Sequence, residues 1–303
     1  MKNRFFDWLN NERHLAYVII IPGFLLLVTF AYLPALQSLR FSFLRYNIKM
    51  PHAIKFRGLY NYNKVLSDPV FWQSAGRVSY FMVLGGILVM LFALGMALVL
   101  NQKFPGRGVL RTLVILPWAI PPVVNGFLWK WILNGDYGAL NGLLYQFGII
   151  EKYQFWLANS LAALTFAVLT FVWRYTPFIT ILFLGGLQSI PGELYEQATV
   201  DGAGALRRFW YITLPMLSRI GAIAVILTLI AAFTVFDDIV TLTGSSPFYD
   251  ATKTPMIYNY EVTFGMGRFG RGSAMAYLVS LLLFGLTFFY IRMSLKKEEE
   301  IIR

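Results

Sequence analysis

Long, mostly apolar stretches constrain this chain more than any other feature of its sequence. A helix that crosses the hydrocarbon core of a bilayer needs about 20 mostly apolar residues. Six stretches of the 303-residue chain meet this requirement, at residues 15–39, 79–100, 112–133, 161–188, 220–242 and 272–291. The sequence therefore predicts an all-α polytopic membrane protein with six transmembrane helices.

The composition excludes several classes of function. Charged residues make up 14% of the chain, whereas soluble domains carry about 25%, so a soluble enzyme is excluded. The chain has no cysteine and only two histidines. Disulfides, thiolate metal sites and cysteine nucleophiles are therefore absent, and a membrane-bound hydrolase or transferase is disfavoured.

The distribution of basic residues bears on partners and orientation. Lys and Arg exceed Asp and Glu by 11, but they lie mainly between the apolar stretches, where they anchor helix ends to anionic lipid headgroups. Membrane lipid is thus the expected partner, and nucleic acid is not. With the N-terminus inside, thirteen basic residues lie in inner segments and eleven in outer ones, seven of these from Arg40 to Arg77. This margin is too small to fix the orientation.

The connection between the fourth and fifth stretches, residues 190–216, predicts two helices and a sharp turn. Pro191 suits the first position of a helix, and Glu193 favours the positive end of the helix dipole. Gly202 can adopt the left-handed conformation that ends a helix, and Pro215 ends a second helical stretch.

This connection resembles the hallmark inner loop of one family, the integral-membrane permease subunits of binding-protein-dependent ABC importers. That loop has the form E-A-A-x-x-D-G-A, followed by F, I, L and P at set distances. The matching residues are Glu196, Gln197, Ala198, Asp201, Gly202, Ala203, Phe209, Ile212, Leu214 and Pro215, with Gln197 in place of an alanine. The segment from Phe236 to Ile239, followed by Leu242 to Pro247, resembles the F-D-x-I…L-T-G-G-P motif of the sugar and oligosaccharide branch, with serines at 245 and 246.

The resemblance implies an ABC importer type I permease fold over residues 15–292, between cytoplasmic segments 1–14 and 293–303. It also implies a second homologous permease subunit, two cytoplasmic ATPase subunits that use ATP and Mg, and an extracytoplasmic substrate-binding protein. The chain itself is expected to bind no cofactor and to be no enzyme, because it lacks the G-x-x-x-x-G-K-[ST] phosphate loop. The residues implied to couple to the ATPase are Glu196, Ala198, Asp201, Gly202, Ala203, Leu214 and Pro215. The loop would face the cytoplasm.

Charged and aromatic residues inside the spans mark a candidate substrate path. Charges within a membrane usually face protein or water, and aromatic rings can stack on sugar rings. The residues predicted to line the path are Phe171, Arg174, Tyr175, Phe178, Phe233, Thr234 and Asp237. Lipid contact or helix packing is the alternative for the aromatic residues, and an interhelical ion pair is the alternative for Arg174 and Asp237. Asp238 could instead lie at the headgroup level.

Two other functions compete with sugar import. The same machine could carry a phosphorylated polyol such as glycerol 3-phosphate, with Arg174 as the anion clamp. An ion-driven secondary transporter could use Asp237 and Glu261 as proton or cation carriers. Prolines at 117, 121, 122 and 177 favour bent helices in any of these cases.

Overall fold

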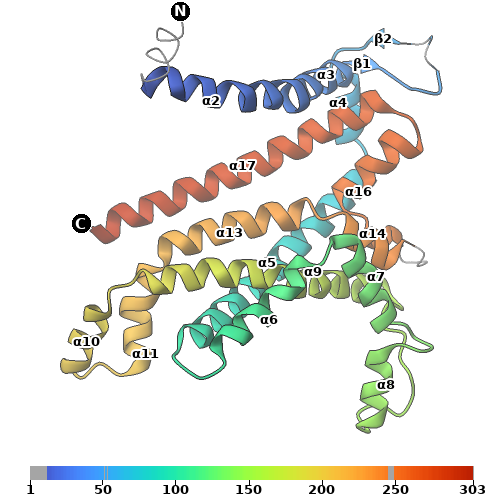
Figure 1. Cartoon of the computed structure of the whole chain (residues 1–303). Helices are drawn as coiled ribbons and strands as arrows, with labels where there is room; N and C mark the ends of the chain where they lie inside the picture. The colour runs from blue at the N-terminus through green and yellow to red at the C-terminus, as the bar shows by residue number, and fades with distance from the viewer. Residues whose placement is uncertain (1–11, 51, 53, 245–248, 303) are drawn as a thin grey trace, which may run out of the picture. The chain divides into compact units, whose positions relative to one another are not determined.

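The structure is a computed structural model that describes residues 12–50, 52, 54–244 and 249–302. It divides into two compact units, one formed by Met1–Asp68 with Asn259–Val279 and the other by Pro69–Tyr258 with Ser280–Arg303. Helices dominate both units (Figure 1), as the sequence predicts.

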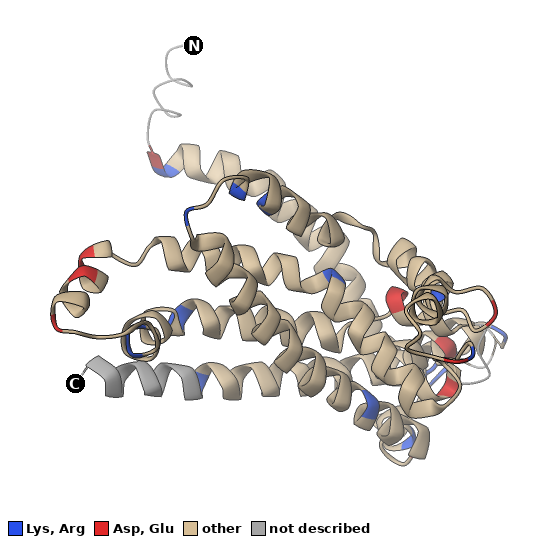
Figure 2. Ribbon diagram, turned by 90° about the horizontal axis from the view of Figure 1, so that it is seen from below, with Lys and Arg blue, Asp and Glu red and all other residues tan. Residues whose placement is uncertain are grey.

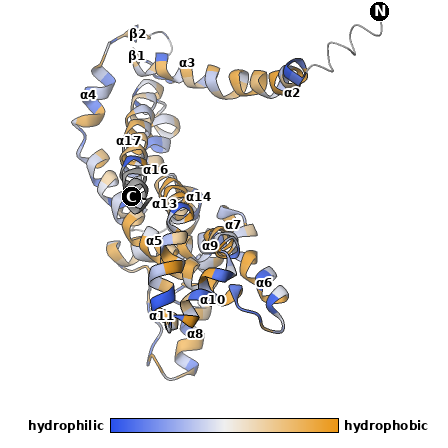
Figure 3. Cartoon of the chain, turned by 90° about the vertical axis from the view of Figure 1, so that its left-hand side faces the viewer, coloured by the Kyte–Doolittle hydropathy of each residue, from blue (hydrophilic) through white to orange (hydrophobic). Residues whose placement is uncertain are grey.

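The first unit consists of apolar helices and a small hairpin. Its elements are α2 (Glu12–Leu27), η1 (Val28–Tyr32), α3 (Leu33–Ser42), β1 (Leu44–Arg45), β2 (Lys55–Phe56), α4 (Tyr60–Leu66), η4 (Glu261–Gly265) and the start of α17 (Phe269–Ile302). The hydroxyl of Tyr277 on α17 donates to the carbonyl of Ala35 on α3 at 2.6 Å. α2 buries none of its residues in the chain and is largely hydrophobic (Figure 3), so its surface requires lipid or another apolar partner.

The second unit is a layered bundle of helices. Its elements are α5 (Pro69–Asn101), α6 (Arg107–Ala119), α7 (Pro122–Ile132), α8 (Ala139–Gln146), α9 (Ser160–Gln188), α10 (Gly192–Val200), α11 (Ala205–Arg208), η3 (Phe209–Thr213), α12 (Leu214–Met216), α13 (Ser218–Phe233), α14 (Asp237–Thr243), α15 (Tyr249–Thr252) and most of α16 (Pro255–Tyr260). α9 is the central helix, since it packs on α5, α6 and α13. Most Lys, Arg, Asp and Glu residues of the described chain lie near helix ends or in the connections between helices (Figure 2).

Four continuous helical segments among the described residues are long and apolar enough to cross a bilayer, and two bent pairs bring the number to six. The four are Glu12–Ser42, Pro69–Asn101, Ser160–Gln188 and Phe269–Arg292. The pair α6 and α7 bends by 96° around Ile120 and Pro121, both in extended conformations. Proline disfavours the helical region for the residue before it, which explains a break here, whereas Pro117 and Pro177 remain inside helices.

The predicted span over residues 220–242 is wrong in its second half. α13 ends at Phe233, and a separate helix, α14, begins at Asp237. Asp237 and Asp238 both lie in the first turn of α14, where carboxylates interact favourably with the helix dipole. The two acids therefore start a new helix and do not continue the apolar one.

Candidate functional site

A helix pair closed by a tight turn lies between α9 and α13, at the end of the second unit opposite to α7 and α14 (Figure 1). We call residues 192–216 the α10–α12 loop. The turn is a Schellman motif, because the N–H of Gly202 donates to the carbonyl of Thr199 at 3.0 Å and the N–H of Ala203 to that of Ala198 at 2.8 Å. Gly202 has a φ of 76°, which confirms the predicted left-handed conformation.

Two side-chain hydrogen bonds hold the two arms of this loop together, the first arm being α10 and the second the helical stretch from Ala205 to Met216. The hydroxyls of Tyr195 on α10 and Thr213 on η3 lie 2.9 Å apart. The Nη1 of Arg208 donates to Oγ1 of Thr199 at 2.8 Å. The second arm continues as a helix to Met216, one residue beyond the predicted end at Pro215. The arms therefore form one unit and do not hang as separate helices.

The outer surface of the α10–α12 loop carries large apolar side chains. Val200 is 88% exposed, Leu206 72% and Tyr211 77%. A pocket of about 270 Å³ opens between the arms, with Ala198, Asp201 and Ala203 among its lining residues. The pocket is also lined by Arg207, Arg208, Tyr211 and Ile212. Exposed apolar side chains around such a recess are typical of a surface that binds another protein.

The predicted coupling residues occupy this surface to different degrees. Glu196, Asp201, Gly202 and Pro215 are exposed, and Ala198, Ala203 and Leu214 are partly buried. All seven belong to the α10–α12 loop, and three of them line its pocket.

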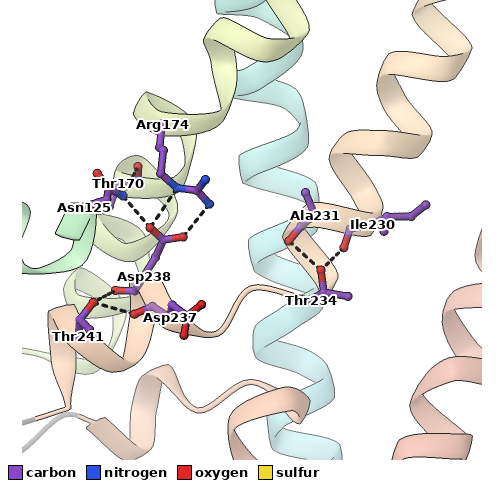
Figure 4. Close-up of polar contacts among 9 residues, drawn as sticks. All are labelled: Asn125, Thr170, Arg174, Ile230, Ala231, Thr234, Asp237, Asp238 and Thr241. Carbon is purple, nitrogen blue, oxygen red and sulfur yellow. Dashed lines mark hydrogen bonds and ion pairs between the residues drawn. The ribbon is translucent and has the colours of Figure 1, made fainter. Parts of the chain in front are cut away.

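A buried ion pair joins α9 to α14. Arg174 contacts Asp238 through Nε to Oδ1 at 3.2 Å and through Nη2 to Oδ2 at 2.9 Å. Asn125 on α7 donates to the same Oδ1 at 2.7 Å, and Figure 4 shows both side chains pointing to the one carboxylate. The side chain of Asp238 is only 3% exposed and that of Arg174 14%, so the cluster neutralises a charge that lipid could not accommodate.

The two adjacent acids lie elsewhere than predicted. Asp238, for which the headgroup level was the expectation, is buried and is the partner of Arg174, whereas Asp237 is exposed and takes no part in the pair. The physical reason is the start of α14, since adjacent residues of a helix point in different directions. Thr234 is exposed at the end of α13, apart from the cluster (Figure 4).

The aromatic residues of the predicted path serve mainly to pack helices. Phe171 and Phe233 are 1% and 2% exposed, and the ring of Phe171 stacks on Tyr175 with centroids 5.2 Å apart. Phe178 stacks on Trp118 of α6 at 5.3 Å. Tyr175 and Phe178 keep partial exposure, so these two rings alone among the four present a surface beyond the core.

Two residues of the cluster escaped the sequence analysis. Asn125 is fully buried, and Gly126 next to it allows α7 to approach α14. A Cβ on Gly126 would lie 1.7 Å from Oγ1 of Thr241 and 2.8 Å from the carbonyl oxygen of Asp238. A polar residue beside a glycine inside an apolar stretch was the available signal.

Known proteins similar to this chain agree with its predicted fold. The model of the family described as binding-protein-dependent transport system inner membrane component matches residues 89–297. The trehalose/maltose transport system permease protein MalF of Thermococcus litoralis is 36% identical over 93% of this chain and 94% of its own length. The sulfoquinovosyl glycerol transport system permease protein SmoG of Agrobacterium fabrum is 30% identical over 97% and 95%.

A solved structure has the same fold. A chain of a bacterial ABC transporter involved in the import of the acidic polysaccharide alginate superimposes with a TM-score of 0.82, at 20% identity, over 97% of this chain and 99% of that one. The family match covers more than half of the chain, and the sequence relatives cover nearly all of it. The chain therefore belongs to the binding-protein-dependent transport system inner membrane components, the non-catalytic permease subunits of ABC transporters.

Proposed function

We propose that this chain forms half of the translocation pathway of an ATP-driven importer of sugars or oligosaccharides. The observation that carries the importer role is the α10–α12 loop, a stiff helix pair with exposed apolar side chains in a chain of this family. The sugar class is supported by relatives named for trehalose/maltose and sulfoquinovosyl glycerol, which align over nearly the whole chain.

The proposed machine has further subunits. A second, homologous permease subunit completes the pathway, and two ATPase subunits bind and hydrolyse ATP with Mg and receive the α10–α12 loops of the two permease subunits. An extracytoplasmic binding protein delivers the sugar, as supported by a structural relative described in complex with an alginate pentasaccharide-bound periplasmic protein. ATP binding and hydrolysis would move the loops and switch the pathway between outward and inward access.

The orientation follows from the coupling role. An ATPase is cytoplasmic, so the α10–α12 loop faces the cytoplasm. With six spans over residues 15–292, four precede this loop and two follow it. Both numbers are even, so segments 1–14 and 293–303 are cytoplasmic as well. Residues 1–11 and 303 lie outside the described part of the chain.

The substrate path is proposed along α9 and the break between α13 and α14. Tyr175 and Phe178 are partly exposed, and Thr234 and Asp237 are exposed, so these side chains are available to a sugar. Rings offer stacking surfaces, while the hydroxyl and the carboxylate accept hydrogen bonds from sugar hydroxyls. Arg174 supports the path indirectly, because its pair with Asp238 fixes α14 beside α9.

The competing cargo and the competing machine are both less well supported. A phosphorylated polyol would need Arg174 as an anion clamp, but this guanidinium is already neutralised by Asp238. An ion-driven transporter disagrees with membership in an ABC permease family.

Co-purification followed by ATPase measurement tests the proposal. Tagged chain should retain an ATPase through detergent extraction, and reconstituted complex with its binding protein should hydrolyse ATP faster in the presence of one or more neutral disaccharides. Stimulation by glycerol phosphates and by no neutral sugar would reject the sugar assignment. Uptake by the lone chain, driven by an ion gradient, would reject the importer.

A further inference from the structure

A basic pocket lies within the unit formed by residues 1–68 and 259–279. Its volume is about 580 Å³, and its lining is rich in cations. The cationic residues that line it are Arg45, Arg57, Lys64, Arg268 and Arg271. They come from two parts of the chain that are far apart in sequence, and the fold of this unit brings them together.

Backbone and side-chain hydrogen bonds build the walls of the pocket. The N–H of Gly270 donates to the carbonyl of Tyr46 at 2.9 Å. The buried amide of Asn61 donates to the carbonyls of Ser42 and Leu44, each at 2.8 Å. A Cβ on Gly270 would lie 2.2 Å from the carbonyl oxygen of Leu44, so the two segments approach as closely as a glycine permits. The cations are therefore held on a defined framework.

Most of this positive charge has no counter-ion within the described chain. Arg271 pairs with Asp68. Arg57 and Lys64 lie over the ring of Tyr60, at 5.3 and 5.8 Å from its centroid. Among the described residues, no carboxylate lies within ion-pair distance of Arg45, Arg57, Lys64 or Arg268 in the structure. Arginine and lysine side chains around one cavity select an oxyanion such as phosphate.

The pocket lies at the ends of two candidate membrane spans. The span Glu12–Ser42 ends three residues before Arg45, and the span Phe269–Arg292 begins immediately after Arg268. The ends of membrane-spanning helices lie at the level of the lipid headgroups. Met50, which also lines the pocket, is 56% exposed and offers an apolar edge beside the cations. At this depth the available phosphate belongs to a lipid.

We propose that this pocket binds the phosphate of an anionic phospholipid. The assignment rests on the membrane placement of the two spans and not on the nature of the imported sugar. With the termini in the cytoplasm, the lipid belongs to the outer leaflet. The pocket also gives a reason for the many basic residues between Arg40 and Arg77, which the positive-inside tendency would place on the opposite side.

Native mass spectrometry of the full-length chain, purified in mild detergent with its accompanying subunits, tests this assignment. The probes are phosphatidylglycerol and phosphatidylcholine with identical acyl chains. The test variants are Lys64→Gln and the double variant Lys64→Gln with Arg268→Gln. Lys55→Gln is the matched control, because Lys55 lies in the same unit, opposite Arg45 in the β1–β2 hairpin, but does not line the pocket. Arg45→Gln replaces Lys64→Gln if the latter does not purify.

The proposal expects wild type and Lys55→Gln to retain phosphatidylglycerol in preference to phosphatidylcholine. Each pocket cation removed should weaken this retention about fivefold. Equal retention of the two lipids, or equal loss in Lys55→Gln, overturns it. Displacement of the lipid by millimolar inorganic phosphate or by an acidic oligosaccharide would overturn the lipid assignment and identify a soluble anion as the ligand. If the pocket variants retained lipid as the wild type does but bound the binding protein more weakly, the lipid assignment would be wrong and the pocket would be a contact for that protein.

Discussion

Arg174 and Asp238 form a two-pronged ion pair across 64 residues of sequence, with the guanidinium Nη2 2.9 Å from Oδ2 and Nε 3.2 Å from Oδ1. Two parallel N–H···O bonds fix the orientation of the guanidinium relative to the carboxylate and also pair their charges. Because Asn125 donates to the same carboxylate, a single acid fixes three helices, α7, α9 and α14. The cluster thus determines where the chain resumes after the end of α13.

Replacing Asp238 by asparagine should destabilise the protein strongly. The change leaves Arg174 buried without its counter-charge, and losing one partner of a buried pair costs about 3–5 kcal/mol. Asp237→Asn is the matched control, since Asp237 is exposed and unpaired with Arg174, and exposed substitutions stay within about 0.5 kcal/mol. Thermal unfolding of purified protein, followed by tryptophan fluorescence, should show a much lower midpoint for Asp238→Asn alone. Equal midpoints for the two variants would contradict the structure.

Substitution of Gly202 should strain the backbone of the α10–α12 loop and so weaken the proposed binding of this loop to the ATPase. A Cβ at this position has open space around it, so the penalty is the left-handed conformation, about 1–2 kcal/mol for most residues and less for asparagine. We expect Gly202→Val to abolish ATPase retention and uptake while membrane insertion persists, and Gly202→Asn to keep a substantial part of both. Quantitative pull-down of the ATPase ranks the variants. If any side chain at position 202 blocked the contact with the ATPase, irrespective of backbone strain, Gly202→Val and Gly202→Asn would lose the ATPase equally.

Gly126→Ala should separate α7 from α14. The added methyl group would overlap Oγ1 of Thr241 and the carbonyl of Asp238, and overpacking of a buried contact costs about 1–3 kcal/mol. The matched control is Gly95→Ala on α5, where a Cβ meets nothing within 4 Å; there alanine should stabilise the helix by about 0.5–1 kcal/mol. Thr241→Ala should rescue Gly126→Ala only in part, because the backbone carbonyl remains. If the double variant unfolded at the same midpoint as the wild type, the carbonyl of Asp238 would not contribute to the strain.

Removal of one hydroxyl should loosen the arms of the α10–α12 loop. Tyr195→Phe deletes the hydrogen bond to Thr213, which is worth about 0.5–1.5 kcal/mol. Hydrogen exchange at the amides of residues 195–203 should become several-fold faster. Tyr211→Phe, at a ring that is 77% exposed, should leave exchange unchanged. If both variants behave alike, the hydroxyl pair does not stabilise the loop.

Local features of this chain could be predicted from its sequence. The turn at Gly202 depends on hydrogen bonds that reach only five residues back, to Ala198, so a glycine after a capped helix was sufficient to predict it. The four continuous spans likewise follow from runs of apolar residues, because lipid imposes the same requirement along each helix.

Features that depend on distant partners were predicted less well. Which of two adjacent acids meets Arg174 depends on the residue at which α14 begins, and a shift of one residue turns a side chain by roughly 100°. The close approach at Gly126 depends on Thr241, more than a hundred residues away in sequence. The basic pocket requires residues 45–64 and 268–271 to meet, which no periodicity along the chain encodes.

The two bonds across the α10–α12 loop have a mechanical consequence. They bind α10 to the helical arm that ends at Met216, and Leu217 leads from that arm directly into the foot of α13. If an ATPase subunit acts on α10 as proposed, these bonds would resist folding at the turn and pass the force to α13. In the proposed importer, the stiffness of the α10–α12 loop would then limit how far α13 moves in each transport cycle.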